Sequence, residues 1–276
     1  MITGRTRIAG VMGAPVTHSL SPLLMNSWIK AAGIEAAYLP FPARDNLSIN
    51  ALRALGQTGL IGLNVTLPFK TLAAKSADIR SSGVQATGAA NLILFKNDKV
   101  EAHNTDIEGV LYAFSQAGQS LENKSVLVLG AGGVARAVCA AVRQGKASRL
   151  IITNRTRARA DELALMFEAD AFDWYDRQSL VNDVDVIINA TNLGLDGQSS
   201  PEIDWTNCKK ETVVFDTVYT PSRRPFTDSA KTSGITVIDG LSMLIGQARP
   251  SFEALFGTPV PDLVDAQALL RKELGQ

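Results

Sequence analysis

A glycine-rich turn between a strand pattern and a helix pattern is the feature that most constrains this chain. Residues 125–137 read SVLVLGAGGVARA, in which the apolar run 126–129 meets Gly130, Gly132 and Gly133 and continues into an alanine-rich segment. A strand, a glycine turn and a helix N-terminus in this order can hold a pyrophosphate on backbone N–H groups. The alternative is an ordinary turn between a strand and a helix. Because both flanking patterns are present, we predict a dinucleotide site at this turn.

The next strand pattern indicates which dinucleotide binds. The apolar run 150–153 is followed by Arg155, Arg157 and Arg159 before the first acid, Asp161. An NAD site usually ends this strand with a carboxylate, which binds the ribose hydroxyls. Guanidinium groups suit a 2′-phosphate instead, because their planar fork is permanently charged. The alternative is a solvated basic start of a helix; we predict NADP.

Composition and charge exclude several classes of protein. The 276 residues are 46% hydrophobic and 20% charged, which is ordinary for an α/β chain with room for two domains. Lys+Arg and Asp+Glu both total 27, so no net field favours nucleic acid or an anionic membrane. Neither the two cysteines nor the two histidines show a metal-ligand spacing. Without a signal-like or membrane-length apolar run, we expect a cytoplasmic protein, either a monomer or a homodimer.

Alternating apolar runs and helical patterns predict parallel βαβ units. We expect a helix that Ser21 caps and Pro22 begins, a second helix over 68–78, and a last one over 263–274. A hairpin is expected to turn at residues 97–98, Asn-Asp. In the second half, strands are expected at 184–189, 213–217 and 235–238.

The pattern predicts two domains. We place the first over residues 1–104 plus 241–276 and the second over residues 105–240. The C-terminal helices are then expected to return to the first domain.

Polar residues gather where one predicted strand ends. Asn64, Thr66 and Lys70 lie in the segment LNVTLPFK, and ligands of open parallel sheets bind outside the carboxyl ends of strands. Asp106 lies at the first crossing between the domains. An amine and a carboxylate that face one cleft can form a proton-transfer pair. From spacing alone, solvated surface roles for Lys70 and Asp106 stay open.

An ordered set of motifs carries a resemblance to a known family. The segments HSLSP, NVTLPFK, AANL, NTD, GAGG, NRT and GLSMLIGQA, spread over about residues 8–256, resemble those of the shikimate dehydrogenase family. The resemblance implies NADP-dependent interconversion of shikimate and 3-dehydroshikimate in aromatic amino-acid biosynthesis. It implies an open, mostly parallel α/β substrate domain and a Rossmann NADP-binding domain, with the active site in the cleft between them.

The resemblance also implies roles for individual residues. Lys70 and Asp106 match the catalytic pair, and Ser19 and Ser21 match hydroxyls that bind the substrate carboxylate. Further substrate contacts are implied for Asn64, Thr66, Asn91, Asp106, Tyr219 and Gln247. Cofactor contacts are implied for Gly130, Ala131, Gly132, Gly133, Val134, Asn154, Arg155, Thr156, Arg159, Thr217 and Gly240. Met243 is expected to pack near the nicotinamide.

Some positions depart from the usual family pattern. Met25 precedes Asn26 where a histidine is frequent, Leu92 replaces a threonine after Asn91, and Arg224 replaces a threonine before a proline. These departures leave open a quinate/shikimate or shikimate-like dehydrogenase with another preferred ring. An alternative of another class is a non-catalytic NADP-binding regulator, which the presence of both Lys70 and Asp106 disfavours. A folate-pathway dehydrogenase is disfavoured by the paired serines and by NVTLPFK.

Overall fold

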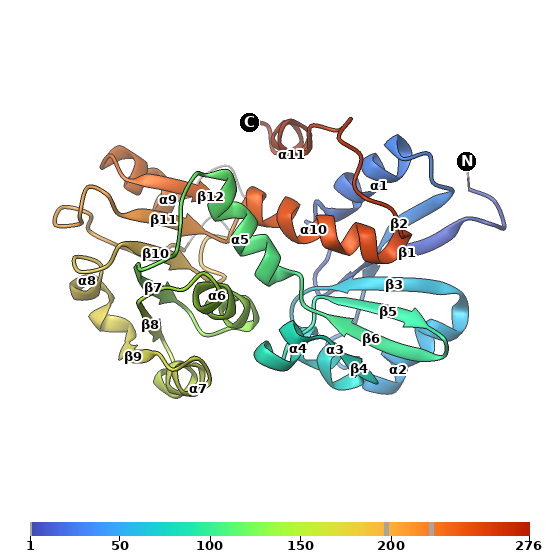
Figure 1. Cartoon of the computed structure of the whole chain (residues 1–276), viewed down its shortest axis with the longest axis horizontal. Helices are drawn as coiled ribbons and strands as arrows, with labels where there is room; N and C mark the ends of the chain where they lie inside the picture. The colour runs from blue at the N-terminus through green and yellow to red at the C-terminus, as the bar shows by residue number, and fades with distance from the viewer. Residues whose placement is uncertain (1, 196–198, 221–223) are drawn as a thin grey trace. The chain divides into compact units, whose positions relative to one another are not determined.

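Two compact units make up the chain (Figure 1). The computed structural model describes residues 2–195, 199–220 and 224–276. Unit 1 comprises Met1–Asp106 and Gln247–Lys272, and unit 2 comprises Ile107–Gly246 and Glu273–Gln276. The predicted divisions after residues 104 and 240 differ slightly from these. The second division, between residues 246 and 247, falls inside the helix Gly240–Phe256. The pattern of a continuous helix does not show at which residue its contacts change from one unit to the other.

Unit 1 contains a mixed sheet in the order β2-β1-β3-β5-β6-β4. Strand β1 is parallel to β2 and β3, and β4 is parallel to β6, whereas β5 is antiparallel to both of its neighbours. The strands are β1 Arg7–Gly13, β2 Ala36–Pro42, β3 Leu60–Val65, β4 Ile79–Arg80, β5 Leu92–Lys96 and β6 Lys99–His103. The hairpin of β5 and β6 turns at Asn97 and Asp98, whose φ angles are 50° and 60°. The structure therefore has the predicted hairpin, at residues that tolerate this conformation.

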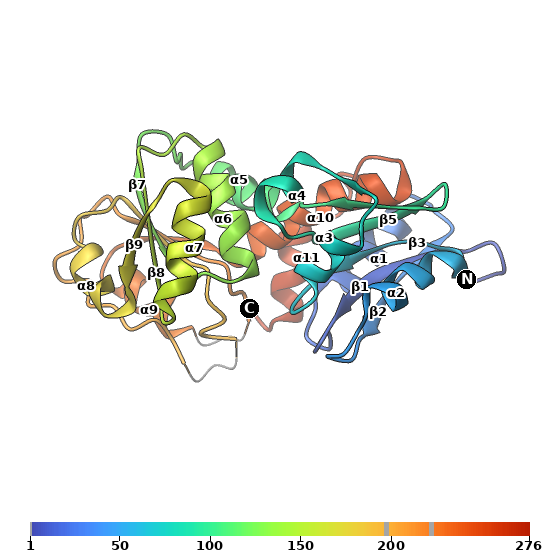
Figure 2. The ribbon, with the colours of Figure 1, turned by 90° about the horizontal axis from the view of Figure 1, so that it is seen from below.

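Helices cover both faces of this sheet (Figure 2). Helix α10 packs on one face, where Phe252 meets Trp28 of α1 edge to face, with ring centroids 5.7 Å apart. Leu52 of α2 and Ala73 of α3 join Leu63 in the core of the other face. The helices are α1 Ser21–Ala31, α2 Ile49–Ala54 with the short η1 Leu55–Thr58, α3 Lys70–Ser76, α4 Ser82–Thr87, α10 Gly240–Phe256 and α11 Ala266–Glu273.

The predicted cap of α1 is wrong. Leu20 occupies the N-cap position with helical angles, and Ser21 is already the first helical residue. The Ser21 backbone N–H donates instead to the Ser19 hydroxyl, 3.3 Å away. A side chain from outside the helix therefore satisfies one of its free N–H groups.

Two other helices start later than their patterns predict. The chain turns over Thr66 to Phe69, with Phe69 N donating to the Thr66 carbonyl at 3.0 Å, so α3 begins at Lys70. Helix α11 begins at Ala266 because the Asp265 carboxylate accepts a hydrogen bond from Ala268 N at 2.9 Å. Local side-chain and turn hydrogen bonds thus decided both starts.

Unit 2 contains an all-parallel sheet in the order β12-β11-β10-β7-β8-β9. Its strands are β7 Ser125–Leu129, β8 Arg149–Asn154, β9 Asp170–Asp173, β10 Val186–Asn189, β11 Val213–Asp216 and β12 Thr236–Asp239. The strand order reverses between β7 and β10, as in the doubly wound dinucleotide-binding fold. The edge strand β9 was not predicted, because four residues with an acid at each end show no strand pattern.

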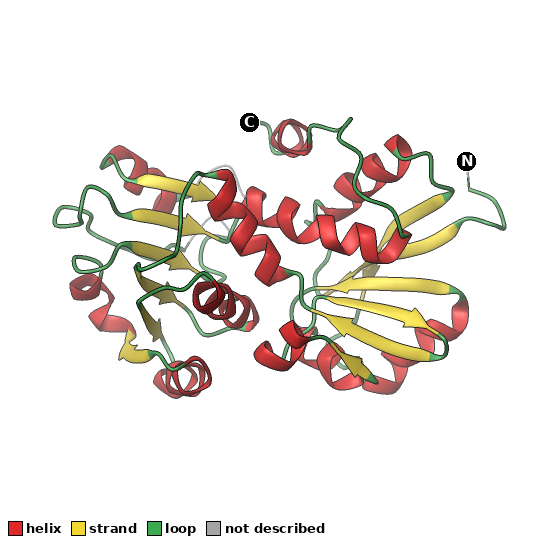
Figure 3. Ribbon diagram, viewed as in Figure 1, coloured by secondary structure: helices red, strands yellow, loops and turns green. Residues whose placement is uncertain are grey.

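Helices lie on both sides of this sheet (Figure 3). Val126 and Val128 pack with α5, α6 and α7, and Leu127 and Leu129 pack with α9 on the other face. The helices are α5 Asp106–Gln116, α6 Gly133–Gln144, α7 Arg157–Phe167, η2 Trp174–Asp176, α8 Arg177–Leu180 and α9 Pro225–Thr232. Among the described residues, no helix is long and apolar enough to cross a membrane.

Among the described residues, Thr153 of β8 places an unsatisfied polar group in this core. Its side chain is fully buried, and its hydroxyl finds no hydrogen-bond partner in the part of the chain that the structure describes. We expect Thr153→Val to raise the free energy of unfolding by about 1 kcal/mol, because it removes a buried polar group that has lost its water. Urea denaturation followed by circular dichroism measures this. As a control, Thr227→Val removes a buried hydroxyl that donates to the Arg224 carbonyl at 3.1 Å, and should be destabilising. Destabilisation by Thr153→Val as well would contradict the prediction.

Candidate functional site

Lys70 and Asp106 form a buried ion pair in unit 1. Each is the first residue of its helix, α3 and α5, and Lys70 Nζ lies 2.6 Å from Asp106 Oδ2. Only 7% of Lys70 and 5% of Asp106 is exposed. Buried charges are stable when they are paired and hydrogen-bonded, so removal of either one would leave the other unpaired. The structure thus joins the two residues that sequence spacing left apart.

Asn91 holds the second oxygen of this carboxylate. Asn91 Nδ2 donates to Asp106 Oδ1 and to Thr105 Oγ1, both at 2.9 Å. Asn91 Oδ1 accepts from the Thr105 backbone N–H at 2.7 Å. A backbone N–H can only donate, so the amide cannot be reversed without loss of this bond. Both carboxylate oxygens of Asp106 are therefore engaged.

Asn64 lies at the end of β3 in the same buried network. Its Oδ1 accepts from the Tyr38 hydroxyl at 2.8 Å, and its Nδ2 donates to the Asn91 carbonyl at 3.1 Å. Gln247 Oε1 lies 3.3 Å from Asn91 Nδ2. Complete burial raises the pKa of Tyr38 well above 10.0, which keeps the phenol neutral and able to donate. Tyr38 was not predicted, since a tyrosine in a strand pattern is an ordinary core residue.

Ser19, Ser21 and Thr66 surround the carboxyl ends of β1 and β3. Thr66 N donates to the Met12 carbonyl at 2.8 Å, and the Thr66 side chain fills the space beside Gly13, where a Cβ would come within 2.4 Å of it. The two serines lie on the segment that leads from β1 into α1. Within the described part of the chain, no hydrogen bond joins either serine to the ion pair.

The glycine turn of unit 2 has the geometry of a phosphate site. Gly130 has φ 112°, and a Cβ there would lie 2.9 Å from the Ala190 carbonyl oxygen, so only glycine fits. Gly132 is the N-cap of α6 without a side-chain cap, and, its two chain neighbours aside, no described residue has an atom within 4 Å of a Cβ built on it. The first N–H groups of α6, which begins at Gly133, therefore meet open space and can bind an anion. Ala131 and Val134 pack against the core.

The arginines after β8 divide into two kinds. Arg157 pairs with Asp161 at 2.8 Å and with Asp173 at 3.2 Å. The hydrogen bond that Arg157 donates to Asp161 and the charges of both acids raise the pKa of Arg157. Arg155 and Arg159 are exposed and, across the described ranges, have no carboxylate within ion-pair distance. The turn before them is held by Asn154 Nδ2, which donates to the Thr156 carbonyl at 2.9 Å. Arg155 and Arg159 are thus the cations available to a phosphate.

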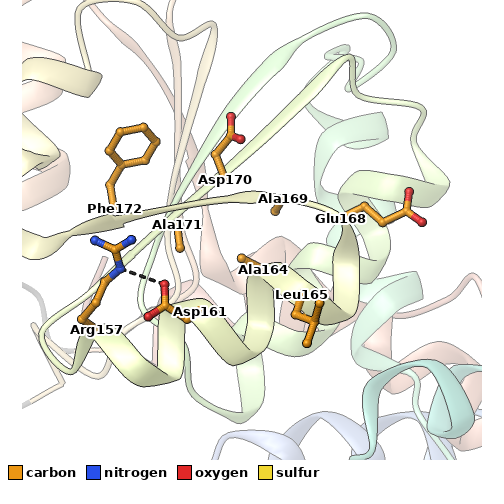
Figure 4. Close-up of a pocket in the computed structure, with 9 residues that line it drawn as sticks. All are labelled: Arg157, Asp161, Ala164, Leu165, Glu168, Ala169, Asp170, Ala171 and Phe172. Carbon is orange, nitrogen blue, oxygen red and sulfur yellow. Dashed lines mark hydrogen bonds and ion pairs between the residues drawn. The ribbon is translucent and has the colours of Figure 1, made fainter.

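A surface hollow of about 550 Å³ lies between α7 and β9 (Figure 4). Its lining includes Arg157, which points at Asp161, together with Leu165, Glu168 and Asp170. None of the predicted site residues lines it. Its acidic residues disfavour an anionic ligand, so we do not count it as part of the site.

Thr217 and Gly240 come together beyond the ends of β11 and β12. A Cβ on Gly240 would lie 2.8 Å from the Thr217 carbonyl oxygen, so the start of α10 packs directly on this backbone. Met243, on the same helix, is 7% exposed and belongs to the core of unit 2. Tyr219 is half-buried on the segment after β11, in unit 2, whereas the other predicted substrate contacts belong to unit 1.

A buried carboxylate adjoins this region. Asp216 Oδ1 accepts from Asn189 Nδ2 at 2.9 Å and from Val218 N at 3.1 Å. Nearby, Arg224 pairs with Asp239 at 2.9 Å. Burial raises the pKa of Asp216 to about 6. Within the described residues, no group of three or more acidic, histidine or cysteine side chains could hold a metal ion.

The family follows from comparison with known proteins. Residues 11–93 match the model of the shikimate dehydrogenase substrate binding domain, and residues 113–200 match that of shikimate / quinate 5-dehydrogenase. The chain is 44% identical to a shikimate dehydrogenase (NADP(+)) of Maricaulis maris over 275 residues, which are 99% of this chain and 98% of that protein. The chain belongs to the shikimate dehydrogenase family. This confirms the family predicted from the ordered motifs.

Solved structures of the family share the fold. The crystal structure of shikimate dehydrogenase from Aquifex aeolicus has a TM-score of 0.91 at 33% identity, covering 98% of this chain and 100% of that one. That of the Thermus thermophilus enzyme, in complex with NADP(H) and shikimate, has a TM-score of 0.86 at 31% identity, covering 96% and 99%. The predicted α/β fold class with two domains is therefore confirmed.

The raised pKa of Asp216 predicts a pH-dependent effect of Asp216→Asn. Between the ordinary pKa of 3.8 and about 6, the folded state holds a proton that the unfolded state has released. The stabilisation from this group is therefore complete below the lower value and lost as pH rises through the higher one. The free energy of unfolding of Asp216→Asn, relative to wild type, should rise by up to about 3 kcal/mol from pH 4 to pH 8. Urea denaturation across this range measures it.

The exposed Asp183→Asn serves as the control, and its difference from wild type should not follow this profile. A difference for Asp216→Asn that stays constant from acid to neutral pH would contradict the assigned pKa.

Proposed function

We propose that this chain catalyses the NADP-dependent interconversion of shikimate and 3-dehydroshikimate, a reaction of aromatic amino-acid biosynthesis. The observation that carries the proposal is the buried Lys70–Asp106 pair, 2.6 Å apart, with Asn91 on the free carboxylate oxygen. A regulator that only binds NADP has no need of a buried ammonium, which costs free energy to desolvate.

The substrate site that we propose lies on unit 1. Ser19 and Ser21 bind the carboxylate, and the remaining contacts to the ring come from Asn64, Thr66, Asn91 and Gln247. Amides and hydroxyls suit a ring that carries several hydroxyls, because each can donate or accept. We assign Tyr219 of unit 2 as a further substrate contact.

The cofactor site that we propose lies on unit 2, whose residues fit NADP. The open N-terminus of α6 at Gly132 suits the pyrophosphate, and the guanidinium groups of Arg155 and Arg159 suit the 2′-phosphate. Thr217 and Gly240 present backbone close to each other and are proposed neighbours of the nicotinamide. When bound, the cofactor supplies or takes up the hydride of the reaction.

Lys70 is the proposed general acid and base of the reaction. In reduction, Lys70 Nζ donates a proton to the substrate oxygen on which negative charge develops, and in oxidation it accepts that proton back. Asp106 holds Nζ in place through the 2.6 Å contact, and it is itself a proposed substrate contact. Asn91 keeps the carboxylate from turning by holding its other oxygen.

One set of rates tests the proposal as a whole. Initial rates are measured by NADPH absorbance for shikimate and quinate, each with NADP and with NAD. We expect shikimate with NADP to give the highest kcat/KM. A preference for quinate would identify the alternative dehydrogenase, and NADP binding without turnover of either ring would identify a regulator.

The role of Lys70 predicts a loss in kcat. Lys70→Ala should lower kcat by at least about 10²-fold with a smaller change in KM, since a general acid acts mainly in the transition state. Lys70→Arg should restore little, because a guanidinium does not readily release a proton. Lys75→Ala, an exposed lysine on the same helix, is the control. A large rise in KM at unchanged kcat would make Lys70 a binding residue instead.

The difference between Arg155, which has no carboxylate partner in the described ranges, and the paired Arg157 predicts an effect on the preference for NADP over NAD. Arg155→Ala should lower kcat/KM for NADP about ten- to a hundredfold, the cost of one charge-assisted phosphate contact, and leave that for NAD nearly unchanged. Arg157→Ala is the matched control, because its guanidinium is already paired with two acids. Equal losses for NADP and NAD in Arg155→Ala would place the 2′-phosphate elsewhere.

A further inference from the structure

Ser251 on α10 is a fully buried residue that is hydrogen-bonded to Asn64 of the candidate site. Its hydroxyl lies within hydrogen-bond distance of Asn64 Nδ2 at 2.9 Å, Thr105 Oγ1 at 3.1 Å and the Gln247 carbonyl at 2.9 Å. A serine hydroxyl has one proton and two lone pairs. These three contacts therefore use its whole capacity.

The direction of each bond follows from its partners. The Gln247 carbonyl can only accept, so it takes the Ser251 proton, and Asn64 Nδ2 can only donate. With that proton committed, the Thr105 hydroxyl donates to Ser251 Oγ. Thr105 Oγ1 is then free to accept from Asn91 Nδ2 at 2.9 Å.

We propose that Ser251 is a positioning residue. Through its hydrogen bonds it fixes the orientation in which the side-chain amides of Asn64 and Asn91 contact the substrate. This inference rests on the proposed function. Without the Ser251 hydroxyl, the Thr105 hydroxyl turns its proton to its other acceptor, Asn91 Oδ1, 3.3 Å away, which redirects the lone pairs that face Asn91 Nδ2. Asn64 Nδ2 loses one of its two acceptors at the same time.

The kinetic test compares two buried serines. Ser251→Ala should raise KM for shikimate about fivefold to thirtyfold, the usual effect of a lost buried hydrogen bond, with KM for NADP and kcat within about threefold of wild type. Ser76 is also buried, and its hydroxyl donates to the Ala73 carbonyl at 2.8 Å; among the described residues, no hydrogen bond joins it to either amide. Ser76→Ala should therefore leave both KM values unchanged. Ser251→Cys keeps the volume but bonds weakly, and should behave as Ser251→Ala.

A double-mutant cycle tests the path through Thr105. If Ser251 acts on Asn91 through the Thr105 hydroxyl, the KM effects of Ser251→Ala and Thr105→Val should combine to less than their product. Multiplicative effects would show that the two hydroxyls act independently and would overturn this part of the proposal.

A spectroscopic readout does not depend on activity. In protein labelled with ¹⁵N-asparagine, the side-chain amide signals of Asn64 and Asn91 should move in Ser251→Ala and stay in place in Ser76→Ala. Unmoved amide signals would overturn the inference even in an active enzyme, as would an unchanged KM for shikimate. Inactivity of the wild-type protein on shikimate would contradict the proposed function, and the amide signals would still decide the orienting role of Ser251.

Discussion

The polar network of unit 1 depends on the contact between the Lys70 ammonium and the Asp106 carboxylate. Two buried charges cost free energy unless they are paired and their remaining hydrogen-bonding capacity is met. The two residues are the first of α3 and α5, and Asn91 holds the second carboxylate oxygen. The backbone N–H of Thr105 in turn fixes Asn91. The polar network thus supplies the hydrogen bonds that the buried ion pair needs.

Unit 2 meets a different constraint, because its proposed ligand is bound by backbone. Gly130 and Gly240 allow close approach of main chains that a Cβ would prevent, and Gly132 leaves the start of α6 open. At the end of β8, charged side chains add to this backbone geometry. There Asp161 and Asp173 pair with Arg157, whereas Arg155 and Arg159 have no carboxylate partner among the described residues. The proposed substrate site of unit 1 is thus built from a side-chain network, whereas the proposed cofactor site of unit 2 depends mainly on backbone geometry.

Predictions from the sequence succeeded where the signal is local. The strand, glycine turn and helix of residues 125–144 and the Asn97–Asp98 hairpin each depend on a few neighbouring residues. Errors arose where another segment decided the outcome. The start of α1 moved because Ser19 supplied the acceptor that Ser21 was expected to supply, and β9 is a strand only because β8 pairs with it.

The sequence by itself determined the fold class, the glycine turn between β7 and α6, and the family, because strand and helix periods and motif order are properties of neighbouring residues. Only the tertiary structure decided which polar groups share hydrogen bonds. Asn64 and Ser251 are 187 positions apart in the chain, yet their side chains meet at 2.9 Å. No local pattern encodes such a contact, since it depends on how α10 packs on the sheet after both have formed.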